Sequence, residues 1–594
     1  MSNQGGSCLI EPGVSVCGSP NGAVQRQGTL VLLLAAAFLL FWGLGWRSLW
    51  AAEGRWAEVT REMLLTGDYF HPTIGGEPYF DKPLLTYWLR AALAAVTGAL
   101  NELTVRIPSA AAGLVTIGST VMIGRRLWPA QTGQIAGWLL LTMYAFLFWS
   151  RTGTADAENL AAITLAVAWY WSKRDRPTFW AMLVFYLIAF VGALTKGLTA
   201  VAVPICMVLP DLVVERRWRI LFGVRHIGAI GLAALVYLSP LVYASWTRPA
   251  DYQSSGLALV FQENILRFFQ PFDHKGPIYL YLYELPILLL PWTPLFVLAA
   301  IGLVKCRKAL DWHTQWLMWA IAAVFLFFSL SGSRRSYYIL PILPLCALLM
   351  AVFVVRTHDV ATEKLRQTGL GAQRALFLGL IAFDLAIPLL LTLAGRIWHL
   401  HIPLGFHVAS LVIGTTAALL YAGLSRFVWP TSSPDGRQAV QPWIGAAVVL
   451  LGGYFCWQEG ILDGNRTEYP FVRELQARSA AFPPGRIAMY PKVNASILFY
   501  LNFDQSIPIL TNVDQLRHFL EPGLPCIVIT QGRYASQFPE DLLTMLWSGQ
   551  YLAEQMQSWE PKSSKQEKWM AWFESHPGEA SDTAKVRESA DRAN

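Results

Sequence analysis

The side chains best suited to chemistry lie in short polar stretches between long apolar runs. The richest stretch spans residues 47–106 and contains Glu53, Arg55 and Lys82. A second stretch, SRTGTADAENL, contains Asp156. A carboxylate can accept a proton from an attacking group, whereas a cation can stabilise a developing negative charge. These residue types therefore indicate a site for proton transfer and anion binding.

Two further cationic residues adjoin apolar segments, where an unpaired charge is unfavourable. Lys196 lies between two apolar segments in ALTKGLTAV, so it needs water, an anion or a partner carboxylate. Its alternative role is to reach the headgroups of the outer leaflet. Arg334 begins an apolar run that contains Tyr338. An arginine fork and a tyrosine hydroxyl suit the oxygens of a phosphate, so we expect a bound anion here.

Each of these stretches also has an ordinary structural interpretation. Residues 53–62 fit an amphipathic helix at the membrane surface, with ion pairs between successive turns. Asp156 begins an apolar run, and a carboxylate there is costly unless it is paired. The functional and structural interpretations of Asp156 are balanced until topology is considered, and topology favours function because Asp156 shares a face with Glu53 and Lys82.

Composition defines the class of protein that carries these residues. Of 594 residues, 54% are hydrophobic and 14% charged, whereas soluble domains carry about 25% charge. The chain is therefore predicted to be an all-α polytopic membrane protein. Its net charge of +7 is interpreted as a topology signal, with no nucleic-acid partner. The seven cysteines form no CxxC pair, so neither a disulfide framework nor a zinc site is expected.

The apolar runs predict about thirteen transmembrane helices. They lie near residues 28–46, 107–124, 131–149, 157–172, 178–194, 197–214, 220–243, 278–303, 314–331, 337–355, 375–395, 403–424 and 442–458. The stretch 84–98 is short and contains Arg90, and we expect it to lie in the interface. With a cytoplasmic N-terminus, this choice places the short basic loops inside the cell, as the positive-inside rule requires. The loop 47–106 and the C-terminal domain then lie on the periplasmic side of the inner membrane.

The chain divides into four parts on this interpretation. Residues 1–27 form a disordered tail, 28–458 the transmembrane domain, 459–575 a small α/β domain, and 576–594 a second disordered tail. The α/β assignment rests on the strand-like segments RIAMYP, SIPILT and CIVITQ, which alternate with helical segments such as VDQLRHFL and EDLLTMLW.

The motifs in combination resemble one family. The first outer loop reads EGRWAEVTREMLLTGDY and then GEPYFDKPLLTYW. Later matches are LTKG at 194–197, ENILRF at 263–268, PW at 291–292 and SGSRRSYYILPILP at 331–344. The pattern is similar to the ArnT-like and protein-mannosyltransferase-like membrane glycosyltransferases of the GT-C class, over roughly residues 28–350.

The resemblance implies a glycosyltransferase that takes its sugar from a polyprenyl-phosphate donor and inverts the anomeric carbon. The acceptor would be a lipid or a protein, and no cofactor is expected, although a divalent metal is possible. The lipid phosphate would be bound by residues drawn from several loops: Arg55, Lys82, Lys196, Arg267, Arg334 and Tyr338.

One position departs from the family pattern. The family usually has Asp-Glu at the start of the loop motif, with the Asp as catalytic carboxylate, and here that pair is Ala52 and Glu53. Either Glu53 has taken over the role of base or Asp156 provides it, and the neighbouring position of Glu53 favours Glu53 modestly. Two other interpretations remain open, a polytopic transporter and a non-catalytic relative that only binds polyprenyl lipid.

Overall fold

A computed structural model describes most of the chain. The described residues are 21–50, 52–249, 276–307, 310–355, 360–398, 403–428, 436–463, 469–479, 485–520, 526–531, 547–549 and 570–575, with the single residues Tyr252, Leu257, Phe482 and Tyr534. The first helix, α1 (Asn21–Phe41), begins within the segment expected to be a tail. Residues 1–20 and the expected C-terminal tail, 576–594, lie outside the described residues.

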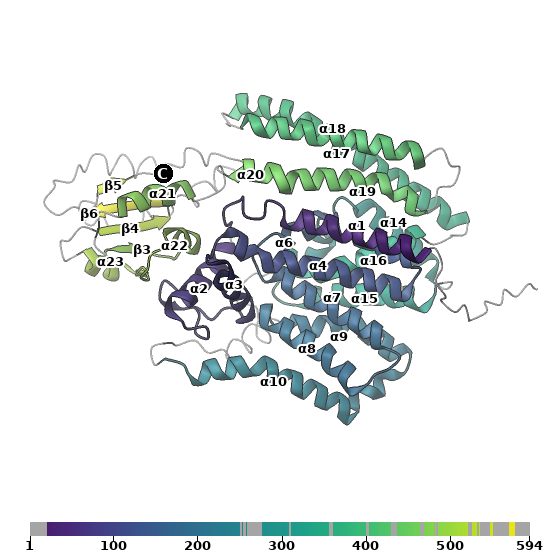
Figure 1. Cartoon of the computed structure of the whole chain (residues 1–594), viewed down its shortest axis with the longest axis horizontal. Coiled ribbons are helices and arrows are strands. Elements are labelled where there is room, and N and C mark those ends of the chain that lie inside the picture. The colour runs from purple at the N-terminus through teal and green to yellow at the C-terminus, as the bar shows by residue number, and fades with distance from the viewer. Residues whose placement is uncertain are drawn as a thin grey trace, which may run out of the picture.

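A bundle of apolar helices makes up most of the molecule (Figure 1). Its first half contains α1, α4 (Glu102–Leu127), α5 (Ala130–Leu141), α6 (Tyr144–Ser150), α7 (Asp156–Lys173), α8 (Phe179–Lys196), α9 (Thr199–Val214) and α10 (Val224–Trp246). Its second half contains α13 (Leu280–Leu288), α14 (Thr293–Lys305), α15 (Trp312–Leu330), η4 (Ser336–Ile342), α16 (Leu343–Val355), α17 (Val360–Trp398), α18 (Leu404–Val428) and α19 (Gly436–Gly453), followed by η5 (Tyr454–Gln458) and α20 (Glu459–Ile461). Every one of the thirteen apolar ranges falls on these helices.

Within the described residues, eight helices are long and apolar enough to cross a membrane, or up to ten if each bent pair is one span. The chain is thus a mostly helical polytopic membrane protein, and the count is lower than the expected thirteen. The bent pairs are α5 with α6, at 72°, and α13 with α14, at 118°. The difference arises at α1 and α9, whose apolar parts are short, and at α7, which carries Asp156, Glu158 and Lys173.

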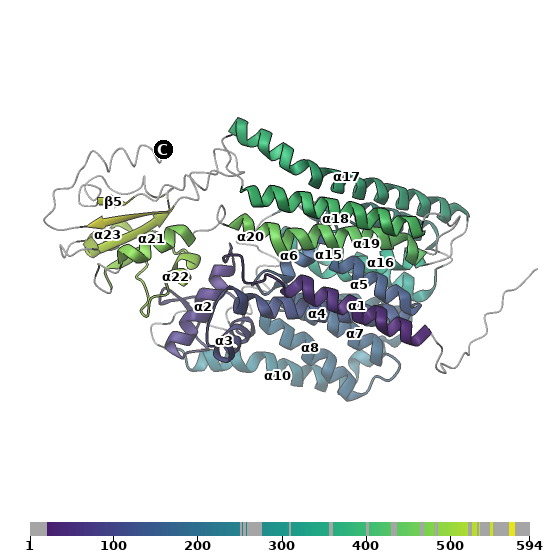
Figure 2. The ribbon, with the colours of Figure 1, turned by 45° about the horizontal axis from the view of Figure 1, so that its top comes forward.

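The first outer loop folds into two short helices and a hairpin at one end of the bundle. Helix α2 (Glu53–Thr66) is followed by strands β1 (Thr73–Ile74) and β2 (Glu77–Pro78) and then by α3 (Leu85–Thr97). At 13 residues α3 is about 20 Å long, too short to cross a bilayer, and it is absent from the candidate spans. Figure 2 shows α2 and α3 next to each other at one end of the bundle.

The C-terminal region contains a four-stranded sheet with neighbouring helices. The strands β3 (Ile487–Met489), β4 (Cys526–Gln531), β5 (Trp547–Gly549) and β6 (Met570–Ser575) take the order β3-β4-β6-β5. The pair β3 and β4 is parallel, and the other pairs are antiparallel. The helices are α21 (Tyr469–Ser479), α22 (Ala495–Leu501) and α23 (Val513–Leu520). The segment SIPILT forms only an isolated bridge, from Ile509 to Met489, and most of EDLLTMLW lies outside the described residues.

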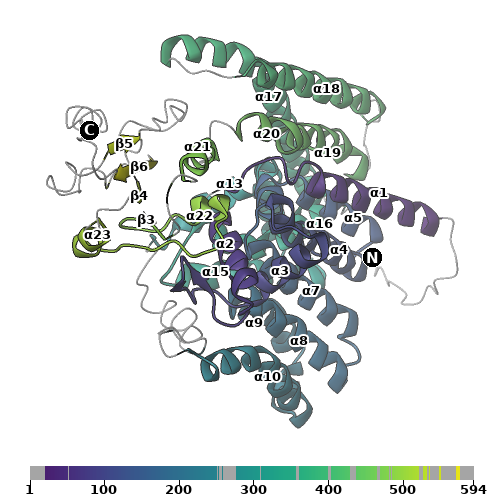
Figure 3. The same ribbon diagram turned by 60° about the vertical axis from the view of Figure 1, so that its left-hand side comes forward.

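This C-terminal region packs directly on the first outer loop, with α22 beside α2 (Figure 3). The Tyr500 hydroxyl is 2.6 Å from the backbone nitrogen of Leu49, which donates to it, and Arg61 donates to the carbonyl of Phe503 at 2.7 Å. At Gly54 a Cβ atom would lie 2.8 Å from the backbone of Ser496, so only glycine allows this approach. The loop that carries the candidate site is therefore held between the bundle and α22 of the C-terminal region.

Candidate active site

The first cluster of the site forms where α2 meets the segment after the hairpin. Arg55, half exposed on α2, donates to the Tyr79 hydroxyl at 2.9 Å and lies 3.8 Å from a carboxylate oxygen of Asp81. Lys82 donates to the other carboxylate oxygen of Asp81 at 2.9 Å. Burial would raise the pKa of Asp81, but the charges of Lys82 and Arg55 lower it below its usual range. The cluster thus presents two cations around one ionised carboxylate.

Buried Glu62 shapes the hairpin that brings this cluster together. Its carboxylate accepts hydrogen bonds from the backbone nitrogen of Gly75 at 2.5 Å and from the Thr73 hydroxyl. Gly75 and Gly76 have φ values of 63° and 77°, in the left-handed region that favours glycine. The chain therefore turns back sharply, and Tyr79 closes the turn by donating its backbone N–H to the carbonyl of Pro72 at 2.8 Å.

The second cluster joins the start of α7 to the end of α8. Lys196 is ion-paired with one oxygen of Asp156, and the Thr154 hydroxyl donates to the other at 2.9 Å. The ammonium of Lys196 also lies over two aromatic rings, 5.2 Å from the centre of Tyr337 and 4.9 Å from that of Tyr338. Lys196 is therefore paired within the protein, which favours the partner-carboxylate role over a side chain that only reaches the headgroups.

Helix α3 connects the two clusters. Thr86 donates to the carbonyl of Thr195, next to Lys196, at 3.2 Å. Arg90, fully buried, donates to the carbonyl of Thr154 and to Glu158, both at 3.3 Å. The ring of Tyr87 packs on Trp56, with centres 5.0 Å apart, one residue from Arg55. The interfacial helix thus holds the two charged clusters at the same end of the bundle.

Glu53 is held differently from the accessible base that the sequence suggests. It is fully buried, and Arg106 binds both of its oxygens, at 2.7 and 2.8 Å. The backbone nitrogens of Trp50 and Gly153 donate to it at 2.9 and 2.6 Å. Burial alone would raise the pKa of Glu53, but Arg106, Arg47 and these hydrogen bonds lower it to about 2. So weak a base, with both oxygens occupied and no exposure, is poorly placed to take a proton from a substrate.

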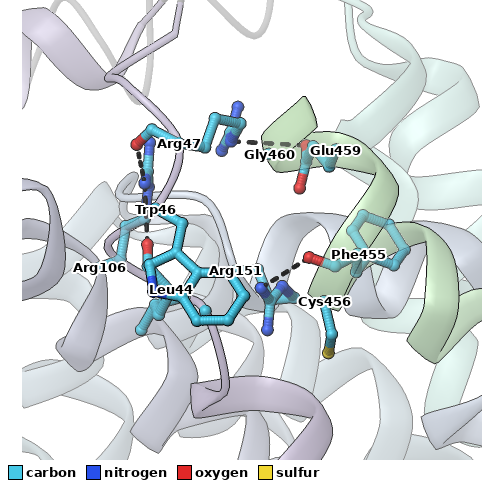
Figure 4. Close-up of a pocket in the computed structure, with 10 residues that line it drawn as sticks. Leu44, Trp46, Arg47, Arg106, Arg151, Phe455, Cys456, Glu459 and Gly460 are labelled. Atoms are coloured by element: carbon cyan, nitrogen blue, oxygen red, sulfur yellow. Dashed lines mark hydrogen bonds and ion pairs between the residues drawn. The ribbon is translucent and has the colours of Figure 1, made fainter. Parts of the chain in front are cut away.

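Beside this ion pair lies a small pocket, drawn in Figure 4, where the loop after α1 meets η5 and α20. Arg47 points toward Glu459, with a separation of 3.4 Å. Arg151 donates to the carbonyls of Leu39 and Phe455 at 2.6 and 3.0 Å. These arginines tie the ends of α1 and α6 to η5 and α20, so the pocket belongs to the support of the site.

The three remaining predicted phosphate ligands are Arg334, Tyr338 and Arg267, and the structure describes the first two. Arg334 is half-buried and donates to two backbone carbonyls, those of Ser329 at 3.0 Å and Gly276 at 2.5 Å. Tyr338 lies beside Lys196, as described above, and so joins the second cluster. Arg267 lies outside the described residues.

The sequence interpretation missed four residues of this arrangement. Tyr79 and Asp81 stand inside the motif GEPYFDKP, next to the predicted Lys82. Arg90 and Arg106 are buried arginines within apolar helices, an expensive placement that signals a paired carboxylate. Among the described residues, no group of three or more His, Cys, Asp or Glu side chains could hold a metal ion.

A helical membrane bundle with cations and carboxylates at one end is the arrangement expected of GT-C glycosyltransferases, and comparison with known proteins identifies the family. Residues 81–244 match the family described as dolichyl-phosphate-mannose-protein mannosyltransferase. The chain is 32% identical over 431 residues to the undecaprenyl phosphate-alpha-4-amino-4-deoxy-L-arabinose arabinosyl transferase of Pseudomonas aeruginosa strain UCBPP-PA14, covering 68% of this chain and 72% of the relative. The corresponding protein of Edwardsiella ictaluri strain 93-146 is 30% identical over 347 residues, 57% of this chain and 61% of the relative.

Solved structures agree with this result at the level of the fold. ArnT from Cupriavidus metallidurans bound to undecaprenyl phosphate superposes with a TM-score of 0.69 at 19% identity, covering 93% of this chain and 99% of that one. Its apo state superposes with a TM-score of 0.66, covering 92% and 98%. The chain belongs to the ArnT-like family of membrane glycosyltransferases, enzymes that depend on polyprenyl-phosphate sugars. Membership confirms the predicted family and its enzyme class and is incompatible with the transporter interpretation.

Proposed function

We propose that this enzyme transfers 4-amino-4-deoxy-L-arabinose from undecaprenyl phosphate to a lipid acceptor of the lipid A class. The relatives that are 30 to 32% identical carry this donor in their names. The family match over residues 81–244 includes Lys82, Asp156 and Lys196. A lipid acceptor is favoured over a protein because α2 and α3 gather the site at one end of the apolar bundle, within reach of a membrane lipid.

The phosphate of the donor would be held by cations from separate elements. Arg55 and Lys82 converge on Asp81, and Lys196 lies with Tyr338 in the second cluster. When the bond from sugar to phosphate breaks, negative charge develops on the phosphate, and fixed cations stabilise it. Arg334, which lies just before η4, and Arg267 complete the predicted set.

We propose Asp156 as the carboxylate that accepts the proton of the attacking oxygen. The observation that carries this choice is the contrast between the two candidates, since both oxygens of Glu53 are closed by Arg106 and backbone nitrogens. Asp156 has one cation and one hydroxyl as partners and retains 8% exposure. A direct displacement of this kind inverts the anomeric carbon. Glu53 instead positions the loop that carries Asp156.

The decisive test uses the purified full-length enzyme. Incubation with undecaprenyl phosphate carrying 4-amino-4-deoxy-L-arabinose and with lipid A should yield a lipid whose mass has increased by that sugar. Donors carrying mannose or glucose provide the comparison, and preferential use of one of them would overturn the sugar assignment. A product formed only with a protein or peptide acceptor would overturn the acceptor class.

We also propose that the chain crosses the membrane thirteen times, because α1, α7 and α9 would add three spans to the ten that length and composition allow. The site would then lie on the periplasmic side. Cysteine labelling can test this orientation. Glu77 is exposed in the hairpin and Arg176 is exposed after α7, at opposite ends of the bundle. A Glu77→Cys variant should react with an impermeant maleimide in intact spheroplasts, and an Arg176→Cys variant only after lysis. The reverse pattern would contradict the proposal.

A further inference from the structure

A second pocket lies at the end of the bundle opposite the candidate active site. It is lined by α7, α8, α9 and α10 and by the short helix η1 (Arg217–Phe222), and its space measures about 740 Å³, including the open mouth. Helix α7 begins at Asp156 in the active site and ends at Lys173 on this pocket, and 18 residues of helix span about 27 Å. The pocket therefore belongs to the other membrane face and is separate from the transfer reaction.

The walls of this pocket are mostly apolar, and some of the lining side chains are exposed on the outside of the bundle. Met182 and Phe185 on α8 and Val208 on α9 line it. Ile205 and Leu209, which also line it, are 37% and 41% exposed on α9. In Figure 1, α8, α9 and α10 lie at one edge of the bundle. A hydrocarbon chain could therefore enter sideways from the bilayer without displacing a helix.

Two cations stand at the mouth without a carboxylate partner. Lys173 and Arg217 line the pocket, and within the described part of the chain neither forms an ion pair. Lys173 lies over the ring of Trp169 at 5.2 Å, and Arg217 donates to the backbone carbonyl of Arg174. Arg174, by contrast, is neutralised by buried Asp211, with two contacts of 2.8 Å. The mouth thus retains two uncompensated positive charges.

A buried polar group in the same wall also lacks a partner. His226 is 7% exposed, and its Nε2 lies 2.8 Å from the Tyr186 hydroxyl. Its Nδ1 has no hydrogen-bond partner among the described residues. A buried ring nitrogen without a hydrogen bond is costly. We therefore expect a ligand that brings a polar group to this nitrogen together with an apolar chain.

We infer that this pocket binds an anionic glycerophospholipid of the membrane leaflet opposite the active site. An acyl chain fills the apolar part, the phosphate lies between Lys173 and Arg217, and an oxygen of the glycerol region reaches His226. Exposed Trp218 and Phe222 place η1 at the depth of the headgroups, where aromatic rings are favoured. Charge complementarity selects an anionic lipid over a zwitterionic one. The inference is independent of the proposed donor and acceptor.

Native mass spectrometry of the purified full-length enzyme tests this site. Phosphatidylglycerol, phosphatidylcholine and inorganic phosphate are titrated separately. The wild-type protein should bind phosphatidylglycerol in preference to phosphatidylcholine. The double variant Lys173→Gln with Arg217→Gln should bind phosphatidylglycerol about tenfold more weakly, because two charged contacts are lost.

Two further variants separate the site from general adsorption. Arg176→Gln removes an exposed cation from the same turn, outside the pocket, and should bind phosphatidylglycerol like the wild type. Leu209→Trp fills the apolar mouth and should weaken phosphatidylglycerol binding while melting temperature stays unchanged. Equal binding by the wild type and the double variant would overturn the inference. So would equal affinity for phosphatidylcholine, or binding of inorganic phosphate that competes with phosphatidylglycerol, since the site would then need no lipid.

Discussion

Arg106 binds both carboxylate oxygens of Glu53, with Nε 2.7 Å from Oε1 and a terminal nitrogen 2.8 Å from Oε2. This fork joins the buried helix α4 to the first residue of α2. Glu53 also accepts the backbone N–H of Gly153 at 2.6 Å, three residues before Asp156. One buried ion pair therefore positions both the outer loop and the segment that carries the proposed base.

Replacing Glu53 by Gln should destabilise the protein strongly. Removing one partner of a buried pair leaves an uncompensated charge, here Arg106, at a typical cost of about 3 to 5 kcal/mol. The melting temperature of the purified protein measures the loss. Glu77→Gln, an exposed glutamate of the same loop, is the control and should melt like the wild type. A Glu53→Gln protein with normal melting and abolished turnover would instead identify Glu53 as the base.

Replacing Asp156 by Asn should abolish most transfer and cost less stability than Glu53→Gln, because Lys196 is partly exposed and keeps the rings of Tyr337 and Tyr338 beside it. Removal of a general base commonly lowers the rate about a hundredfold to ten-thousandfold. The change keeps the size of the side chain and its hydrogen bond with Thr154. Turnover is measured with saturating donor, and melting temperature checks the fold. Retention of most of the turnover would exclude Asp156 as the base.

Replacing Lys82 by Ala should weaken use of the donor. One charged hydrogen bond is typically worth about 1.5 to 3 kcal/mol, so kcat/KM should fall roughly tenfold or more. Arg334→Ala should have a similar effect, and Arg334→Lys should rescue it only in part because an ammonium lacks the fork. Transfer assays at matched protein levels measure kcat/KM for each variant. Unchanged kcat/KM in both alanine variants would remove these residues from the phosphate site.

Glu58 predicts a pH dependence of stability. Burial raises the pKa of Glu58 from 4.5 to about 7, although Arg61 counteracts the effect. The folded state then binds more protons than the unfolded state between these values, so stability falls as pH rises through this window, by up to about 3 kcal/mol. Melting curves recorded from about pH 5 to about pH 8 should show this fall, and Glu58→Gln should flatten it. Parallel curves for the two proteins would contradict the assignment.

Replacing Gly54 by Ala should loosen the contact between α2 and α22 of the C-terminal region. The new Cβ would lie 2.8 Å from the backbone of Ser496, which has no flexible end to move aside. Limited proteolysis should release the C-terminal region faster, and the melting temperature should fall. Gly118→Ala is the matched control, because a Cβ there meets nothing within 4 Å. Equal proteolysis rates in the two variants would show that the contact tolerates a side chain.

The sequence by itself determined the class of the protein and the region that carries its site. Low charge and long apolar runs require a bilayer, because only the hydrophobic interior accommodates such composition. The motifs around Arg55, Lys82 and Arg334 identified the family, which the comparisons confirmed. The short length of 84–98 also indicated an interfacial helix, and α3 is not among the candidate spans.

Only the tertiary structure showed how each carboxylate is held. In the sequence, Glu53 is a glutamate beside Ala52, at the start of a surface helix, and its position favours the role of base. Its partner Arg106 is 53 residues away, and Gly153 is 100 residues away, so their convergence follows from helix packing. That packing closes both oxygens of Glu53 and leaves Asp156 partly open. The proton affinity of a carboxylate depends on its burial and its neighbours, and these are properties of the folded chain.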